Sequence, residues 1–224
     1  TPLPTQQPDK DELIKRMQRF EFFAKLPARV VAELAASSTV EVFRAGDFLW
    51  RQGEANRRVV FIEQGLVKAA RSNKKGVGRT YGLYGPGESM GIFAIWAGMK
   101  YPTDAVAMND GMGGIFIDAE AVLKFSEKYP RLAGPLRVEI GRFSEAFINK
   151  IEIVSAGTVP QRLAVLMTLL IDRYGVDKKG HKARLPITLT LEQISEIVGV
   201  RLETVARVLS LWKREGWLSI DSNG

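Results

Sequence analysis

Glycine is concentrated in one stretch of this chain. Thirteen of its 21 glycines lie between Gly46 and Gly114, interleaved with short runs such as VEVF, RVVFI, GLVKAA and GGIFI. β-Branched and aromatic residues favour strands, and glycine at regular intervals favours the tight turns that join antiparallel strands. This pattern predicts a compact antiparallel β-roll or barrel. Because helical patterns flank it, the expected fold class is α+β.

Helical patterns lie on both sides of the glycine-rich stretch. Residues 1–9 contain three prolines and are expected to form a mobile tail. From about residue 11 to residue 37, the apolar spacing predicts short helices broken at Pro27. Asp118 is a candidate N-cap for the helical stretch AEAVLKFSEKY, which stops before Pro130.

A long helix is predicted from about residue 136 to residue 155. Its apolar residues recur at steps of three and four and form one seam: Leu136, Ile140, Phe143, Phe147, Ile151 and Val154. The apolar side chains of such a seam are expected to pack against another element, either the chain's own sheet or a second helix. The charged residues beside it (Arg137, Glu139, Arg142, Glu145 and Glu152) favour a second helix and therefore a homodimer.

After Gly157, which ends the long helix, the chain becomes helical again. Thr158 can cap the apolar helix VPQRLAVLMTLLIDRYG, and the polar loop DKKGHK then leads to a strand-like segment, LPITLT. Thr190 and Gln193 have the spacing of a capping box, which predicts a new helix from Leu191.

Gly199 has the position of the turn glycine in a helix-turn-helix. The residues at the offsets of the shared core are apolar, namely Ile194, Val198, Val200, Val205 and Val208, and Ser195 is the small residue required where the helices approach. In the second helix, Val205, Val208, Leu209 and Trp212 form a buried stripe. The opposite face carries Glu203, Ala206, Arg207, Ser210, Lys213 and Arg214.

The chemistry of this outer face suits a DNA major groove. Arg207 can donate two hydrogen bonds to guanine, Glu203 can accept one from cytosine, and Ala206 completes the expected base-reading group. The expected phosphate contacts are Arg201, Thr204, Lys213 and Arg214. A net charge of +7 and a pI near 9.7 agree with a polyanionic partner, double-stranded DNA.

Composition removes several other classes of function. The chain has no cysteine and a single histidine, His181, in a polar loop, so we expect neither an iron–sulfur cluster, nor haem, nor a bound metal. No carboxylate pair or phosphate loop suggests catalysis, and an enzyme is not expected. No apolar run approaches the length of a membrane span, and the chain opens without an apolar signal segment, so a cytoplasmic protein without membrane contact is expected.

Five segments in order resemble the family of the cyclic-AMP receptor protein and the fumarate and nitrate reduction regulator (Crp/Fnr). They are FRAGDFLWRQGE, VFIEQGLVK, YGPGESMG, PQRLAVLMTLL and ISEIVGVRLETVARVLSLWKREGWL. The resemblance implies a cyclic-nucleotide-binding-like jelly roll at 1–130, a dimerisation helix at 131–156 and a winged helix-turn-helix at 157–224. It also implies a transcription regulator acting on an inverted-repeat operator, which would contact RNA polymerase if it is an activator.

The recognition segment RLETVAR matches the family's E-T-x-x-R core at Glu203, Thr204 and Arg207. Four positions depart from the family pattern and leave the outer half-site preference open: Leu191, Arg201, Leu202 and Ala206.

The sensor region departs from the cyclic-nucleotide pattern of the family. Ile92 stands where those members have a ribose-binding Glu, and Thr103 and Asp104 stand where they have a phosphate-binding Arg and Ser or Thr. An aliphatic side chain accepts no hydrogen bond, and a carboxylate repels phosphate. Cyclic AMP is therefore not expected to bind.

What remains is a pocket between the roll and the long helix. Its candidate residues are Gly91, Ile92, Phe93, Trp96, Met99, Tyr101, Thr103 and Asp104. A small apolar or aromatic effector suits such a pocket, although these side chains also suit a plain core and regulation by abundance needs no ligand. The alternative function for the whole chain is a small-molecule-binding module whose output is protein contact.

Overall fold

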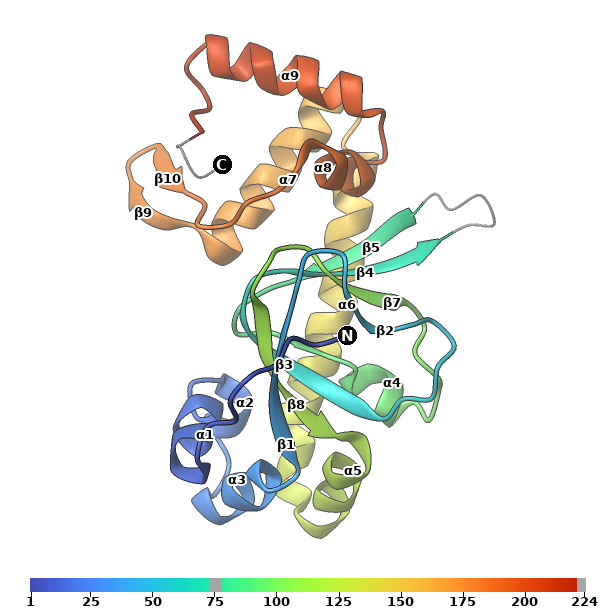
Figure 1. The fold of residues 1–224 in the computed structure, drawn as a ribbon. Helices are drawn as coiled ribbons and strands as arrows, with labels where there is room; N and C mark the ends of the chain where they lie inside the picture. Colours follow the sequence, from blue (N-terminus) through green and yellow to red (C-terminus); the bar gives the residue numbers. More distant parts are fainter. Residues whose placement is uncertain (73–77, 221–224) are drawn as a thin grey trace. The chain divides into compact units, whose positions relative to one another are not determined.

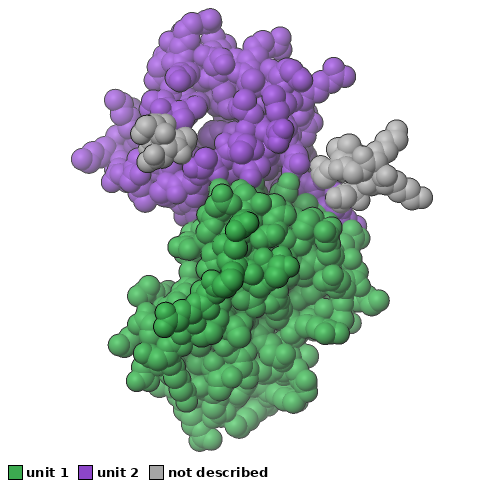
Figure 2. All heavy atoms as spheres, in the orientation of Figure 1, with its two compact units in different colours: residues 1–70, 83–146 green, residues 71–82, 147–224 purple. Residues whose placement is uncertain are grey.

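The computed structural model describes residues 1–72 and 78–220. The chain forms two compact units (Figure 2). Unit 1 comprises residues 1–70 and 83–146, and unit 2 comprises residues 71–82 and 147–224. These units divide the chain within the long helix, whereas the three segments predicted from sequence divide it at residues 130 and 156. Residues 73–77 and 221–224 of those segments lie outside the described residues.

Two four-stranded antiparallel sheets form the β-structure of the N-terminal region, so the predicted roll is confirmed (Figure 1). The first has the strand order β1-β8-β3-β6 and the second β2-β7-β4-β5. The strands are β1 (Ser38–Phe43), β2 (Phe48–Trp50), β3 (Arg58–Gln64), β4 (Val67–Ser72), β5 (Gly78–Tyr84), β6 (Ser89–Met90), β7 (Asp104–Ala107) and β8 (Met112–Asp118).

Strand β3 is buried on both faces because its alternate residues enter different cores. Val59 and Phe61 belong to an apolar core shared with the flanking helices, whereas Val60 and Ile62 belong to a second core with residues of the other sheet. Strand β8 passes so close that a Cβ on Gly114 would lie 2.6 Å from the Phe61 carbonyl oxygen. Only glycine fits there.

The helices of this region follow the predicted pattern, except for α4 (Ile92–Trp96), which lies within the stretch expected to form strands and turns. They are α1 (Lys10–Met17), α2 (Glu21–Ala24), α3 (Ala28–Ala35), α4 (Ile92–Trp96), α5 (Ala119–Lys128), the short 3-10 turn η1 (Pro130–Leu132) and α6 (Ala133–Ser155). Pro27 is the N-cap residue of α3, as expected for a break between short helices. The Asp118 carboxylate accepts the Ala121 N–H at 3.0 Å and caps α5.

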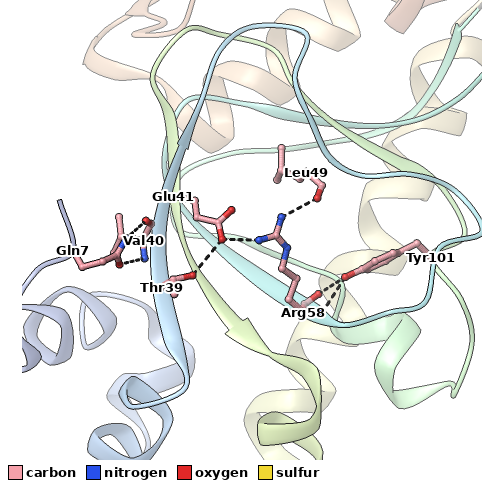
Figure 3. A network of polar contacts seen from close by, with 7 residues as sticks. All are labelled: Gln7, Thr39, Val40, Glu41, Leu49, Arg58 and Tyr101. Carbon is pink, nitrogen blue, oxygen red and sulfur yellow. Dashed lines mark hydrogen bonds and ion pairs between the residues drawn. The ribbon is translucent and has the colours of Figure 1, made fainter. Parts of the chain in front are cut away.

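The N-terminal segment is hydrogen-bonded to strand β1, so the prediction of a mobile tail is wrong. The Leu3 N–H donates to the Val42 carbonyl at 2.7 Å. The Gln7 amide donates to the Val40 carbonyl and accepts the Val40 N–H, each at 2.8 Å (Figure 3). Proline content alone did not reveal these contacts.

Unit 2 carries the C-terminal helices. They are α7 (Val159–Tyr174), α8 (Leu191–Val198) and α9 (Leu202–Arg214), with a hairpin of β9 (Val176–Lys179) and β10 (Lys182–Arg184) after α7. The predicted strand at LPITLT is wrong, because pairing occurs in the preceding polar segment and residues 185–190 form no strand. Both predicted caps are present: the Thr158 N–H donates to Gln161 and the Thr190 N–H donates to Gln193. No helix in the described ranges is long and apolar enough to cross a membrane.

Candidate nucleic-acid interface and sensor pocket

Helices α8 and α9 pack through a shared apolar core around a glycine turn. Gly199 has a φ of 75°, a left-handed conformation that favours glycine, and its N–H donates to the Ser195 carbonyl at 2.8 Å. Ile194, Val198 and Val205 are at most 5% exposed. The predicted helix-turn-helix is therefore present.

The face of α9 opposite this core is exposed and cationic. Arg207 and Lys213 are exposed on this face, and Arg201 is exposed at the N-cap position directly before the helix. Within residues 1–72 and 78–220 the side chains of these three residues form no hydrogen bond or ion pair. Arg214 lies 3.8 Å from Glu215. Glu203 is also exposed, whereas Thr204 and Ala206 are half-buried. Unneutralised guanidinium and ammonium groups on one helix face are what a phosphate backbone attracts.

A groove of about 630 Å³ runs between the first turn of α7 and one side of α9. It brings together three of the predicted DNA contacts, Thr204, Arg207 and Arg214. Val159 and Pro160 form its other side, and sequence reasoning did not connect them with α9 because they lie on a different helix.

Lys150 is a residue that sequence reasoning missed. It lies on α6, and its ammonium group donates a short hydrogen bond to the Ile197 carbonyl at the end of α8. Burial lowers the pKa of Lys150 to about 8. A lysine within a helix ordinarily lies in solvent, so the residues around Lys150 in the sequence do not predict this contact.

The sensor pocket is largely filled by aromatic side chains of unit 1. Its remaining space is about 20 Å³, which accommodates one water, whereas ligand pockets span roughly 300–1,000 Å³. Trp50 and Tyr101 stack with ring centroids 4.3 Å apart, and Phe93 and Phe143 stack at the same distance. Four predicted pocket residues line this space: Gly91, Phe93, Tyr101 and Thr103.

The other four predicted pocket residues lie elsewhere. Ile92 is 3% exposed and enters the core beneath the flanking helices, one residue before Phe93 on the same helix. Trp96 and Met99 are 45% and 42% exposed, so they belong to the surface. The Asp104 carboxylate is buried and accepts the Gln52 N–H at 2.8 Å. The assignment of Ile92, Trp96, Met99 and Asp104 to the sensor pocket is therefore corrected.

A polar network fixes the orientation of Tyr101 (Figure 3). Its hydroxyl donates to the Arg58 carbonyl at 2.7 Å and accepts the Arg58 N–H at 3.1 Å. The Arg58 guanidinium in turn donates to Glu41 at 2.6 Å and to the Leu49 carbonyl at 3.1 Å. Burial raises the pKa of Tyr101. The hydroxyl therefore stays protonated, and the ring is held against Trp50.

These residues do not fit a cyclic nucleotide. The position expected to bind the ribose is an isoleucine directed into the core, and the position expected to bind the phosphate has a carboxylate engaged with the backbone. The space left beside the stacked rings is about 20 Å³, which is too small for a purine.

The predicted seam of α6 does not form one uncovered face. Leu136 is 1% exposed in the core of unit 1, Phe143 stacks on Phe93, and the Phe147 ring lies 6.4 Å from that of Tyr81. Ile140 and Val154 are half-buried. Ile151 is the seam residue that is well exposed, at 63%. Leu136 is therefore removed from the predicted seam, because the core of unit 1 buries it, while Phe143 and Phe147 are partly covered by rings of the chain itself.

A different set of apolar residues is exposed on α6. Val138 is 44% exposed, Ile148 is 63% exposed, and Gly141 is exposed between them. Within unit 2, Ile148 and Ile151 are three residues apart, which places them side by side on one face of the helix. We call these two residues, Ile148 and Ile151, the α6 stripe.

Comparison with known families agrees with this architecture. A model of the Cyclic nucleotide-binding domain matches residues 40–129, and a model of the Crp-like helix-turn-helix domain matches residues 161–224. A β-roll of this kind followed by a long helix and a DNA-binding helix pair defines a DNA-binding transcription regulator. The chain belongs to the Crp/Fnr family, which is a family of regulators and not an enzyme class.

Individual relatives are distant but similar over most of their length. The "CRP-like cAMP-activated global transcriptional regulator" of Mycobacterium tuberculosis is 24% identical over 211 residues, covering 94% of this chain and 92% of the relative. "Transcriptional activator protein anr" of Pseudomonas aeruginosa is 25% identical, covering 80% and 72%. The structure of FixK2 from Bradyrhizobium japonicum shares the fold, with a TM-score of 0.70, 18% identity, and coverage of 83% and 89%.

Proposed function

We propose that this protein is a homodimeric regulator that binds an inverted-repeat DNA site through α9 and its twofold copy. The observation that carries the proposal is the outer face of α9, where Arg207 and Lys213 are exposed and, among the described residues, form no ion pair, while the opposite face is buried. Arg201, directly before α9, is exposed as well. Two such helices related by a dyad enter successive major grooves about 34 Å apart. The site is then an inverted repeat with half-sites about one helical turn apart.

The proposed dimer contact is the α6 stripe, which replaces the seam expected from sequence. Burial of these exposed isoleucines against a second copy of the chain stabilises the dimer. A twofold axis along this face pairs each stripe with its own copy, as closed dimers require.

Each residue of the α9 face has a proposed role. Arg207 reads guanine and Glu203 reads the paired cytosine or a neighbouring base, in a TGA-like core of the kind the family uses. Ala206 lies between them and contacts a base edge. Arg201, Thr204, Lys213 and Arg214 hold phosphates and provide affinity that does not depend on sequence.

Selection of preferred sequences from a random DNA pool tests this assignment. Arg207→Ala is expected to lose about 1–3 kcal/mol per half-site and to relax the preference at one base pair. The matched control, Lys213→Ala, weakens all sequences alike and reduces the salt slope by about one unit. If wild type and Arg207→Ala enrich the same base at that position, Arg207 does not read it.

The proposal extends to how the regulator is controlled and what it contacts. The narrow aromatic pocket and the engaged Asp104 support control by something other than a cyclic nucleotide, either a small apolar effector or the abundance of the protein. If the protein is an activator, the exposed basic hairpin of β9 and β10 is its proposed contact with RNA polymerase.

A further inference from the structure

The segment from β6 through α4 is joined to α6 at two points within unit 1. The Ser89 hydroxyl donates to the Glu139 carboxylate, and the Phe93 ring stacks on Phe143 with an interplanar angle of 10°. The two contacts are four residues apart in both segments, and on α6 this interval is about one helical turn. We call these two contacts the clamp.

The polar half of the clamp is anchored inside the protein. Glu139 is 5% exposed, and Arg142 donates to its other oxygen at 2.8 Å. Arg142 also donates to Glu21 of α2 at 2.7 Å. A buried carboxylate is costly unless its oxygens are paired, so Ser89 and Arg142 together stabilise Glu139 in this position.

The apolar half of the clamp fills the pocket. Phe93 and Phe143 both line the space of about 20 Å³, together with the Trp50–Tyr101 stack. A ligand bound between α4 and α6 would stabilise their contact only by bridging them. Here side chains of the chain itself form that bridge.

We propose that the clamp takes the place of an effector and holds the protein in its DNA-binding state without any ligand. This inference rests on the proposed function, because its readout is affinity for DNA. It implies that a variant lacking one phenyl ring becomes a regulator that requires a small aromatic molecule. An unfilled apolar cavity of roughly 150 Å³ is known to bind benzene, so the missing ring has a simple chemical substitute.

The test compares Phe93→Ala with Phe125→Ala. Phe125 is the matched control, since it is also a half-buried ring stacked on an aromatic side chain, Tyr129, but it lies on α5 outside the pocket. Affinity is measured by fluorescence anisotropy on a duplex carrying the selected site, with and without benzene. Circular dichroism melting reports folding and benzene binding.

We expect Phe93→Ala to bind DNA at least about tenfold more weakly than wild type. This corresponds to a fall, from near one to about one tenth, in the fraction of protein molecules that are in the DNA-binding state. Benzene should restore most of that affinity, while Phe125→Ala stays near the wild-type value and does not respond. The inference is overturned if folded Phe93→Ala binds like wild type, or if benzene raises its melting temperature without restoring DNA affinity.

Ser89→Ala keeps the test decisive if Phe93→Ala does not fold, because it removes the polar contact and creates almost no cavity. Its affinity for the same duplex should fall at temperatures where circular dichroism shows the variant folded, and an unchanged affinity overturns the clamp. A wild-type protein that enriches no DNA sequence refutes the proposed function itself, whichever way the variants behave.

Discussion

The α6 stripe allows the strength of the proposed dimer to be estimated. Burying a whole isoleucine side chain contributes about 2 kcal/mol. Ile148 and Ile151 are each 63% exposed, so a partner can gain about 1.3 kcal/mol from each of them. Replacement by alanine leaves only the Cβ and removes about 1 kcal/mol per side chain. A twofold dimer buries each residue twice, so the double variant loses about 4 kcal/mol, or about a thousandfold in the dimer dissociation constant.

Sedimentation equilibrium over a range of concentrations measures this loss for Ile148→Ala/Ile151→Ala. Alanine is a strong helix former, so α6 itself should remain intact. Leu123→Ala is the matched control, because Leu123 is an exposed apolar residue of α5 at 38% and lies outside the stripe. A double variant whose dissociation constant stays near that of wild type and of Leu123→Ala would refute the stripe as the dimer contact.

Three further outcomes are expected. The pKa of Lys150 is about 8 in the folded protein and about 10.5 in the unfolded chain, so between these pH values the unfolded state binds more protons. The free energy of unfolding should therefore rise with pH over this range. Urea unfolding midpoints should show the rise for wild type, and Lys150→Met should lose it. Cyclic AMP at millimolar concentration should leave the melting temperature unchanged, and a concentration-dependent rise would contradict the assessment of the pocket. If the protein is an activator, Lys179→Glu in the hairpin should lower transcription while DNase footprints persist, and loss of the footprint would assign the hairpin to DNA.

Features set by neighbouring residues were predictable from the sequence. The Asp118 and Thr190 caps join a side chain to an amide three residues away, so their spacing in the sequence suffices. The turn at Gly199 is local in the same way, because the glycine conformation and the two adjoining apolar stripes lie within one short segment. The helix caps and the helix-turn-helix could therefore be predicted from the residue pattern alone.

Features that depend on which distant part of the chain packs over a residue could not be predicted from the sequence. Ile92 and Phe93 are adjacent and both apolar, yet the helix directs one into the core and the other onto Phe143. The spacing of Leu136 marks a helix face but does not identify what covers that face, and the chain's own core does. Trp96 has an apolar side chain, yet the structure leaves it exposed at the surface. Each of these outcomes depends on contacts between residues far apart in the sequence.

The contacts of Leu3 and Gln7 with β1 have a consequence for solubility. Strand β1 is the last strand of its sheet, and a terminal strand with free backbone groups can pair with another molecule. The Leu3 N–H and the Gln7 amide occupy the Val42 carbonyl and both backbone groups of Val40. Deleting residues 1–8 would leave these groups open, and the shortened protein would be prone to aggregate through strand pairing even with both of its cores intact.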